Sequence, residues 1–194
     1  MTSRTDQKEQ TRQHILECAA DLFRTQGVAG TSLTDIMTEA GLTHGGFYAH
    51  FKNKEDLLAH SYTAAMDSSR EEWFEDIIEH EPEEALRLLI NRYLSRDHRD
   101  NPDEGCPMPA LLGELEKEGL CATEAEQALR TSIHRAKPSV AQARHLSPEA
   151  ADAETVATFA TMVGGMLLAR SVADEDYSNY ILKSCRAFLK KEIR

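Results

Sequence analysis

The chain has 194 residues, of which 41% are hydrophobic and 28% charged. No run of about 18 apolar residues is present, which argues against a membrane span. The N-terminus MTSRTDQKEQTRQ lacks the apolar core of a signal peptide, so we expect a cytoplasmic protein. The sequence contains no Gly-rich phosphate loop, HExxH or GxSxG motif, and we expect no metal and no cofactor.

The net charge is −11, which argues against nucleic acid because phosphate contacts need Lys and Arg. The charge is unevenly distributed, however. Residues 1–60 hold six Lys or Arg and eight Asp or Glu, a net −2, so −9 belongs to the remaining residues. Whole-chain charge therefore does not exclude a local surface that faces DNA. The four cysteines lie far apart without a CxxC motif, and we expect reduced thiols.

Glycines divide the first helical elements. Residues 8–26 have apolar side chains at helical spacing, and Gly27 supplies a stop. The next segment, TDIMTEA, predicts a second, short helix. Ser32 or Thr31 can cap its start, and Gly41 follows its end.

Thr43 is a plausible N-cap for a third short helix that runs to about residue 51. Asn53 can cap a fourth helix that runs toward Trp73. Two short helices joined by a glycine-containing turn match the helix-turn-helix pattern. Such helices are marginal alone and require packing against the neighbouring helices. A generic helical bundle with a tight corner is the alternative.

The rest of the chain also predicts helices, which makes the fold class all-α. The fourth helix is expected to end near residue 80, and residues 97–109 are expected to form a polar, proline-punctuated loop. Further helices are expected at 83–96, 109–118, 122–136, 139–145 (after Pro138), from Ser147–Pro148 through the apolar segment TVATFATMVGGMLLARSV, and at 177–191.

The order of residues in 11–58 resembles the N-terminal DNA-binding domain of TetR-family transcriptional repressors. The resemblance implies a three-helix helix-turn-helix domain at residues 1–55 and a larger helical ligand-binding and dimerisation domain at residues 56–194. The residues that carry it are Ile15, Ala19, Leu22, Phe23, Gly27, Thr31, Ile36, Ala40, Gly41, Leu42, Phe47, Tyr48, Phe51, Lys54 and Leu57.

In this family the third helix enters the major groove of double-stranded DNA with its N-terminal end toward the bases. Gly45 and Gly46 each cost about 0.8–1.0 kcal/mol relative to alanine within a helix. We interpret them as permitting close approach to DNA; relief of a helix-packing clash is the alternative. The chain departs from the family at His44, where Lys or Arg is common. The expected DNA-binding residues are Thr31, Thr43, His44, Gly45, Gly46, Tyr48, His50 and Lys54.

The last two helices are either buried core or, by the resemblance, the pair that forms a four-helix bundle between two protomers. A two-fold homodimer would place two reading heads on a palindromic operator. The expected dimer-interface residues are Phe159, Val163, Met166, Leu167, Tyr180, Ile181 and Phe188.

The resemblance also implies an inducer site, although no motif marks one. The candidate ligand residues are Trp73, Tyr93, Met108, Leu112 and Cys106, of which all but Cys106 fit ordinary core better than a pocket wall. Cys106 precedes the expected start of a helix, where a thiol is favoured as thiolate. We therefore expect it to sense oxidants or electrophiles, with Cys121 as a resolving partner. The alternative is a small apolar side chain at a helix entrance.

The leading interpretation is a ligand-responsive, dimeric DNA-binding repressor without catalytic activity, released by a small-molecule or thiol-reactive inducer. One alternative is a thiol enzyme that pairs Cys106 with His98 or His134. A second alternative is an interaction module that does not bind DNA and uses the acidic C-terminal part.

Overall fold

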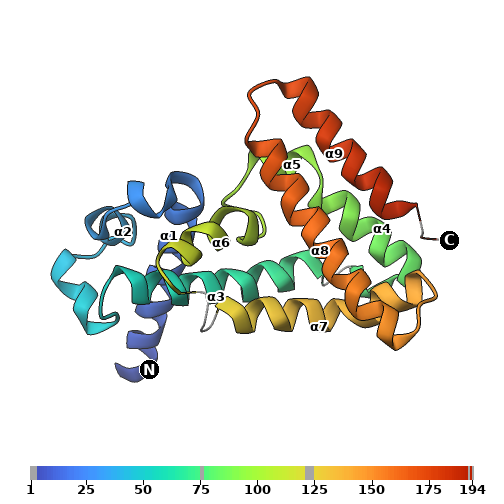
Figure 1. The fold of residues 1–194 in the computed structure, drawn as a ribbon. Coiled ribbons are helices and arrows are strands. Elements are labelled where there is room, and N and C mark those ends of the chain that lie inside the picture. Colours follow the sequence, from blue (N-terminus) through green and yellow to red (C-terminus); the bar gives the residue numbers. More distant parts are fainter. Residues whose placement is uncertain (1–3, 75–76, 121–124, 192, 194) are drawn as a thin grey trace.

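The computed structural model describes residues 4–74, 77–120, 125–191 and 193, of which 70–74 and 78 are described by their backbone alone. These ranges are all-α, as the sequence predicts (Figure 1). The elements are α1 (Arg4–Gly30), α2 (Leu33–Glu39), η1 (His44–Ala49), α3 (Lys54–Phe74), η2 (Ile77–Glu79), α4 (Pro82–Tyr93), α5 (Arg96–Asp100), α6 (Met108–Lys117), α7 (Glu126–Ala143), α8 (Pro148–Arg170) and α9 (Glu175–Lys190).

The ends of α2 follow from local hydrogen bonds. Ser32 Oγ accepts from the N–H of Asp35 at 3.1 Å, and the Asp35 carboxylate accepts from the N–H of Ser32 at 2.9 Å, which completes a capping box. Gly41, at φ +67°, ends the helix, and the N–H of Leu42 donates to the Met37 carbonyl at 2.8 Å. Of the two predicted caps, Ser32 is therefore the one that the chain uses.

The predicted third helix is present, but η1 is a six-residue 3₁₀ helix. Thr43 precedes it in extended conformation, and its side chain makes no capping hydrogen bond. The tighter 3₁₀ form suits short pieces of chain. Phe47 and Phe51 point into the core and are fully buried or nearly so.

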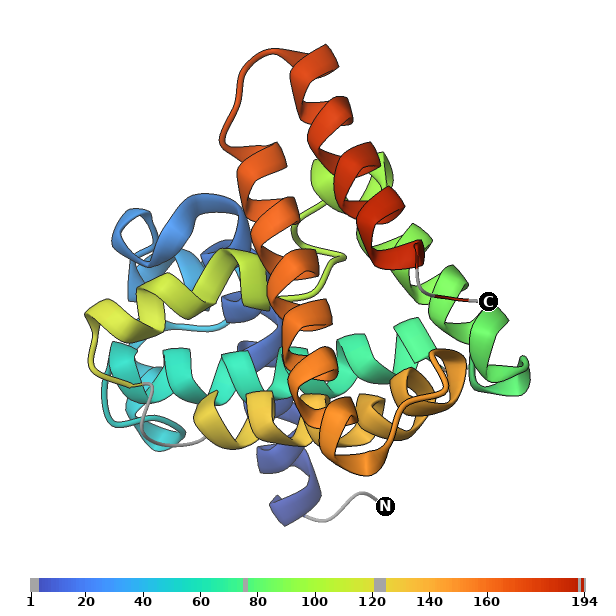
Figure 2. The same ribbon diagram turned by 45° about the vertical axis from the view of Figure 1, so that its right-hand side comes forward.

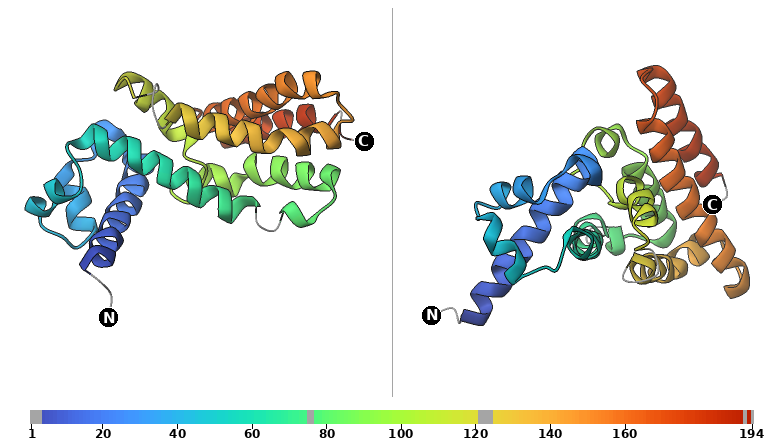
Figure 3. Two further views of the ribbon diagram at one scale, coloured as in Figure 1. Left: turned by 90° about the horizontal axis from the view of Figure 1, so that it is seen from below. Right: turned by 60° about the vertical axis from the view of Figure 1, so that its left-hand side comes forward.

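The interior contains two main hydrophobic clusters. The first unites α1, α2 and η1 with side chains of α3 and α6, including Leu57, Tyr62 and Leu111. The second joins α4, α7, α8 and α9. The predicted domain boundary at residues 55/56 thus falls at the start of α3, which runs from the N-terminal elements into the larger part (Figure 3). We call α1, α2 and η1 the head.

Two expectations for the larger part are wrong. The predicted loop at 97–109 begins with the short helix α5, because Ser95 Oγ caps it by accepting from the N–H of His98 at 3.0 Å. The predicted break at Pro138 is also absent, since α7 continues through it. Pro138 and His134 lie on an exposed side of α7, where water can bind the carbonyl that proline leaves without a partner.

Helices α8 and α9 lie side by side at the side of the molecule away from the head (Figures 1 and 2). Ser147 caps α8 before Pro148, as predicted, and Asp174 caps α9. At Gly165 an added Cβ would lie 2.8 Å from Cys185 Sγ, so the absent side chain permits the close approach of the two helices. Within the described ranges, no helix combines the length and apolar character that crossing a membrane requires.

Candidate nucleic-acid interface

The tip of the head is an exposed polar surface built on a buried aromatic base. Thr43, His44 and Gly45 are exposed, and Tyr48 retains 64% of its accessible surface. The Tyr48 ring meets the His44 ring edge-on, with centroids 6.1 Å apart, and the buried Phe47 ring at 5.2 Å. The predicted DNA-contacting side chains at 43, 44 and 48 therefore share one solvent-facing tip.

The two glycines of η1 are not required by packing within the chain. A Cβ on Gly45 would meet nothing within 4 Å. A Cβ on Gly46 would lie 3.7 Å from Met37 Cε, an ordinary van der Waals contact. The helix-packing alternative is therefore wrong for Gly45, whose open side faces solvent.

Basic side chains of α1 flank the end of η1. The guanidinium carbon of Arg12 lies 4.9 Å from the centroid of the Phe51 ring. Burial lowers the pKa of His50, and the positive charges of Lys8 and Arg12 lower it further. His50 is half-buried, and within the described part of the chain its Nδ1 has no hydrogen-bond partner. His50 thus lies at the border between the core and the exposed tip.

Two predicted DNA contacts have internal roles. Thr31 is 1% exposed, and its hydroxyl donates to the carbonyl of Gly27 at 2.9 Å. The prediction of a DNA contact by the Thr31 side chain is therefore wrong; it holds the kink that Gly27, at φ +75°, introduces into α1. Lys54 is half-buried, and its ammonium donates to the Val28 carbonyl, which ties α3 to the end of α1. A contact between a DNA phosphate and the remaining N–H groups of Lys54 stays a prediction.

The residues predicted for the dimer interface differ in how far each side chain is buried. Leu167, Tyr180 and Phe188 are 53%, 62% and 68% exposed. Met166 is fully buried in the second cluster of its own protomer, so its assignment to the interface is wrong. The remaining three, which are partly buried, are Phe159, Val163 and Ile181.

Sequence reasoning missed three exposed apolar side chains of the same helices: Val156, Leu168 and Tyr177. The rings of Tyr177 and Tyr180 stack with centroids 6.2 Å apart, and their spacing of three residues in a helix was the available signal. The exposed apolar side chains of α8 and α9, which we call the α8–α9 apolar set, are Val156, Leu167, Leu168, Tyr177, Tyr180 and Phe188.

The predicted ligand residues whose side chains are described lie in the core or pack against it. Tyr93 and Met108 are buried core, and Leu112 packs half-buried against the first cluster. The side chain of Trp73 lies outside the described residues. A cleft of about 1260 Å³ lies between α1, α3 and residues 92–105, and none of the predicted ligand residues lines it.

The environment of Cys106 opposes the predicted reactivity. Burial raises the pKa of its thiol, outweighing the lowering effects of the Met108 N–H, the Tyr93 hydroxyl and Arg170. The expectation of a lowered pKa at the helix entrance is therefore wrong. Cys121, the suggested resolving partner, lies outside the described residues.

His98 is also unsuited to the thiol-enzyme alternative. Its Nε2 accepts from the backbone N–H of Cys106 at 3.1 Å, and its Nδ1 donates to the Tyr93 carbonyl at 2.6 Å. Both ring nitrogens are thus engaged, and burial lowers the pKa of His98 to about 4. His134, the other candidate base, is exposed on α7. Among the described residues, no three or more His, Cys, Asp or Glu side chains gather in a group that could hold a metal ion.

Residues 15–60 match the sequence profile of "Bacterial regulatory proteins, tetR family". The chain is 52% identical over 60 residues to the HTH-type transcriptional regulator AcrR of Shigella flexneri, covering 30% of this chain and 28% of that protein. It is 42% identical over 72 residues to the regulator TtgR of Pseudomonas putida, covering 37% and 32% of the two chains. The matched part is thus about three-tenths of the length of these relatives.

Solved structures extend the likeness to the whole fold. A TetR-family regulator from Cytophaga hutchinsonii has a TM-score of 0.78 at 24% identity, covering 100% of this chain and 98% of that one. The reduced form of E. coli NemR also has a TM-score of 0.78, at 18% identity, covering 95% and 97%. Both comparisons concern the fold, a helix-turn-helix head on a larger helical domain.

Proposed function

The chain belongs to the TetR family of bacterial regulatory proteins, and from this premise we propose that it is a transcriptional repressor, a homodimer that binds a palindromic operator and is released by an inducer. The observation that carries the proposal is the tip of the head. It combines exposed polar groups, a glycine with open space and a rigid base of buried Phe47.

The exposed side chains and open backbone of the tip are suited to contact with a DNA groove. Tyr48 and His44 project from η1, and contacts between aromatic rings restrain their side chains. Gly45 leaves the backbone uncovered on the same side, so a DNA edge can come close. Thr43, Gly46, His50 and the remaining N–H groups of Lys54 complete the proposed contact set. Lys8 and Arg12 supply positive charge beside it.

The α8–α9 apolar set supports the dimer. Exposed apolar side chains gathered on two adjacent helices mark an interaction surface more often than isolated ones do. Gly164 has nothing within 4 Å of its absent Cβ, so a helix of a second copy can approach α8 there. A two-fold pairing of these helices would place the two heads on two half-sites.

The inducer is proposed to act either on Cys106 or by non-covalent binding. Cys106 packs against both hydrophobic clusters, so a group added to its sulfur would separate the two. The corresponding reaction is addition of the thiol across an activated double bond, which forms an S–C bond while the thiol proton ends on the adjacent carbon. The raised pKa of Cys106 makes this addition slow at neutral pH. A non-covalent small molecule is the other inducer in the proposal.

The proposal is tested by titrating the purified protein onto the DNA upstream of its own gene at two salt concentrations. We expect dissociation constants of about 10⁻⁸ M or below that rise with salt. Tyr48→Ala should weaken binding while the fold stays intact by circular dichroism. The titration is repeated with reduced protein and a pool of genomic fragments. An affinity no better than for random DNA in both experiments would reject the proposal that the protein is a repressor.

Release is tested in the same titration with Cys106→Ser. An electrophile that frees wild-type protein from DNA but not Cys106→Ser supports the thiol branch. Equal release of both proteins assigns the effect to another site and removes Cys106 from the proposal.

A further inference from the structure

Residues 95–106, which join α4 to α6, are held from two sides of the molecule. On the head side, Arg24 of α1 donates from Nη1 to the carbonyl of Gly105 at 2.8 Å. The Arg24 side chain is 8% exposed, and its other donors bind the Ala20 carbonyl and the Asp21 carboxylate. Arg24 is thus a fixed side chain whose hydrogen bond reaches from the head into the larger domain.

The middle of this segment is locked by His98. Its ring bridges the Tyr93 carbonyl and the N–H of Cys106. Gly105 lies against the ring so closely that an added Cβ would be 2.3 Å from His98 Cδ2. A displacement of Gly105 therefore cannot occur without moving His98 or breaking its hydrogen bonds.

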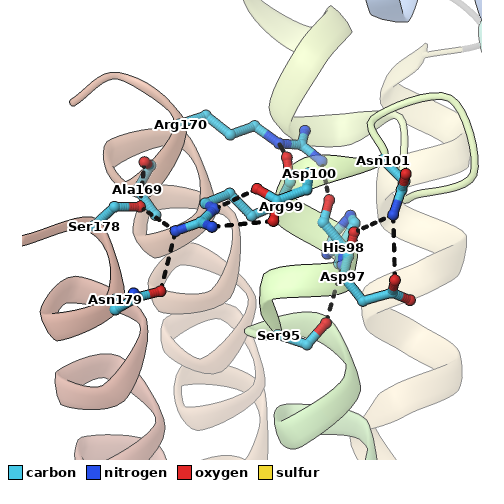
Figure 4. A network of polar contacts seen from close by, with 10 residues as sticks. All are labelled: Ser95, Asp97, His98, Arg99, Asp100, Asn101, Ala169, Arg170, Ser178 and Asn179. Atoms are coloured by element: carbon cyan, nitrogen blue, oxygen red, sulfur yellow. Dashed lines mark hydrogen bonds and ion pairs between the residues drawn. The ribbon is translucent and has the colours of Figure 1, made fainter. Parts of the chain in front are cut away.

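On the other side, Arg170 at the end of α8 holds α5 (Figure 4). Its Nε donates to the Arg99 carbonyl at 3.1 Å, and its Nη2 donates to the His98 carbonyl. Arg99 in turn donates to Ser178 Oγ at 2.9 Å and Asn179 Oδ1 at 3.1 Å, both in α9. The segment is therefore hydrogen-bonded to α8 and α9 as well as to α1.

We propose that residues 95–106 fix the position of the head relative to α8 and α9, with Arg24 and Arg170 as the two positioning residues. This inference rests on the proposed function, because α8 and α9 matter for DNA only if they hold the dimer. Two heads must match half-sites about 34–36 Å apart, one helical turn. The setting of the head against the dimer helices then decides which half-site spacing is bound.

Apolar packing alone does not give this precision. The head also rests on α6 through buried side chains such as Met108 and Leu111. Hydrophobic contact is non-directional, however, whereas a hydrogen bond from a charged donor has a preferred geometry. The Arg24–Gly105 contact, and a second hydrogen bond from Ser69 Oγ of α3 to the same carbonyl at 3.4 Å, thus add directional contacts to this apolar interface.

The first test needs no DNA and uses hydrogen exchange on the full-length protein. Arg170→Met keeps the length of the apolar stem and removes the donors. We expect the Cys106 amide, bound to His98 Nε2, and the amides of α1 around Arg24 to exchange about tenfold faster. Arg130→Met is the matched control, because Arg130 is 72% exposed on α7 and pairs with Glu126. Unchanged exchange near Arg24 would overturn the inference.

The second test measures spacing selectivity on DNA that the wild-type protein selects, against the same DNA with one base pair inserted between the half-sites. The insertion moves one half-site by about 3.4 Å. We expect Arg24→Met and Arg170→Met each to reduce the wild-type preference about tenfold, the double variant no further, and Arg24→Lys to restore part of it. Equal losses on both DNAs would indicate general destabilisation and overturn the inference.

The two tests separate the inference from the proposed function. If wild-type protein selects no DNA, the repressor is rejected, and the exchange result alone decides whether residues 95–106 couple α8 to the head.

Discussion

Gly165 in α8 lies in tight contact with Cys185 in α9, because an added Cβ on Gly165 would lie 2.8 Å from Cys185 Sγ and 3.2 Å from a methyl group of Leu94. An added Cβ on the neighbouring Gly164 would meet nothing within 4 Å. Adjacent glycines thus serve different surfaces of one helix.

Alanine substitutions at these two positions should have different effects on stability. Gly165→Ala should lower the free energy of unfolding by about 1–3 kcal/mol, because the core there cannot accept another methyl group. Gly164→Ala should keep or slightly raise it, since alanine is the better helix former by about 0.8–1.0 kcal/mol. Urea unfolding of both variants measures these free energies. Equal losses of unfolding free energy in the two variants would show that the two glycines do not differ as described.

Gly45→Leu should leave the fold unchanged and impair DNA binding. The new side chain would project into open space at the tip, so unfolding should shift by no more than about 0.5 kcal/mol. The same side chain would stand between η1 and DNA, and operator affinity should fall at least about tenfold. Gly113→Leu is the control, since Gly113 is also exposed with nothing within 4 Å but lies on α6. Equal affinities of the two variants would exclude the tip as the contact surface.

Phe188→Glu should produce folded monomers. Phe188 is 68% exposed in the single chain, so a carboxylate there costs little until a second copy buries it. Sedimentation velocity should show half the mass of the wild type with unchanged helical content. Tyr48→Glu, at a side chain of similar exposure in the head, should remain dimeric and lose DNA binding. A Phe188→Glu dimer of wild-type stability would place the interface elsewhere.

Acid should destabilise the protein through His98. Its folded pKa of about 4 lies below the ordinary 6.5, so the unfolded chain binds the proton first as pH falls. The neutral ring therefore contributes stability that is present above about pH 6.5 and is lost toward pH 4, up to about 3 kcal/mol.

Urea midpoints between pH 7 and 4 measure this loss. A His98→Gln variant, which has no proton to bind, should show a shallower decline. Parallel curves for the two proteins would mean that His98 is not the group responsible.

The features that sequence predicted best are those with local causes. Ser32 caps α2, Gly41 ends it and Ser147 caps α8 because each interaction involves only a few neighbouring residues. Phe47 and Phe51 lie four residues apart, a helical spacing that indicates a shared face, and both are buried. All of these residues except Ser147 lie within residues 15–60, the range that matches the family.

The errors arise where tertiary contacts decide. Thr31 is polar and lies near a helix start, yet the kink at Gly27 turns its hydroxyl inward. The pKa of Cys106 depends on burial between two clusters, which outweighs its position before a helix. Met166 and Leu167 are adjacent and equally apolar, and only the packing of α8 shows which one faces outward. Residues far apart in the chain determine the outcomes for Cys106 and Met166, whereas a nearby kink determines the outcome for Thr31.

The most direct measurement is selection of DNA from fragmented genomic DNA by the purified wild-type protein, followed by sequencing of the bound fragments. A homodimer that reads DNA through the η1 tip should enrich an inverted repeat whose half-site centres are one helical turn, about 34–36 Å, or a multiple of it apart. The Gly45→Leu protein should enrich it far less. Bound fragments with no shared sequence, or a motif enriched equally by both proteins, would contradict the account.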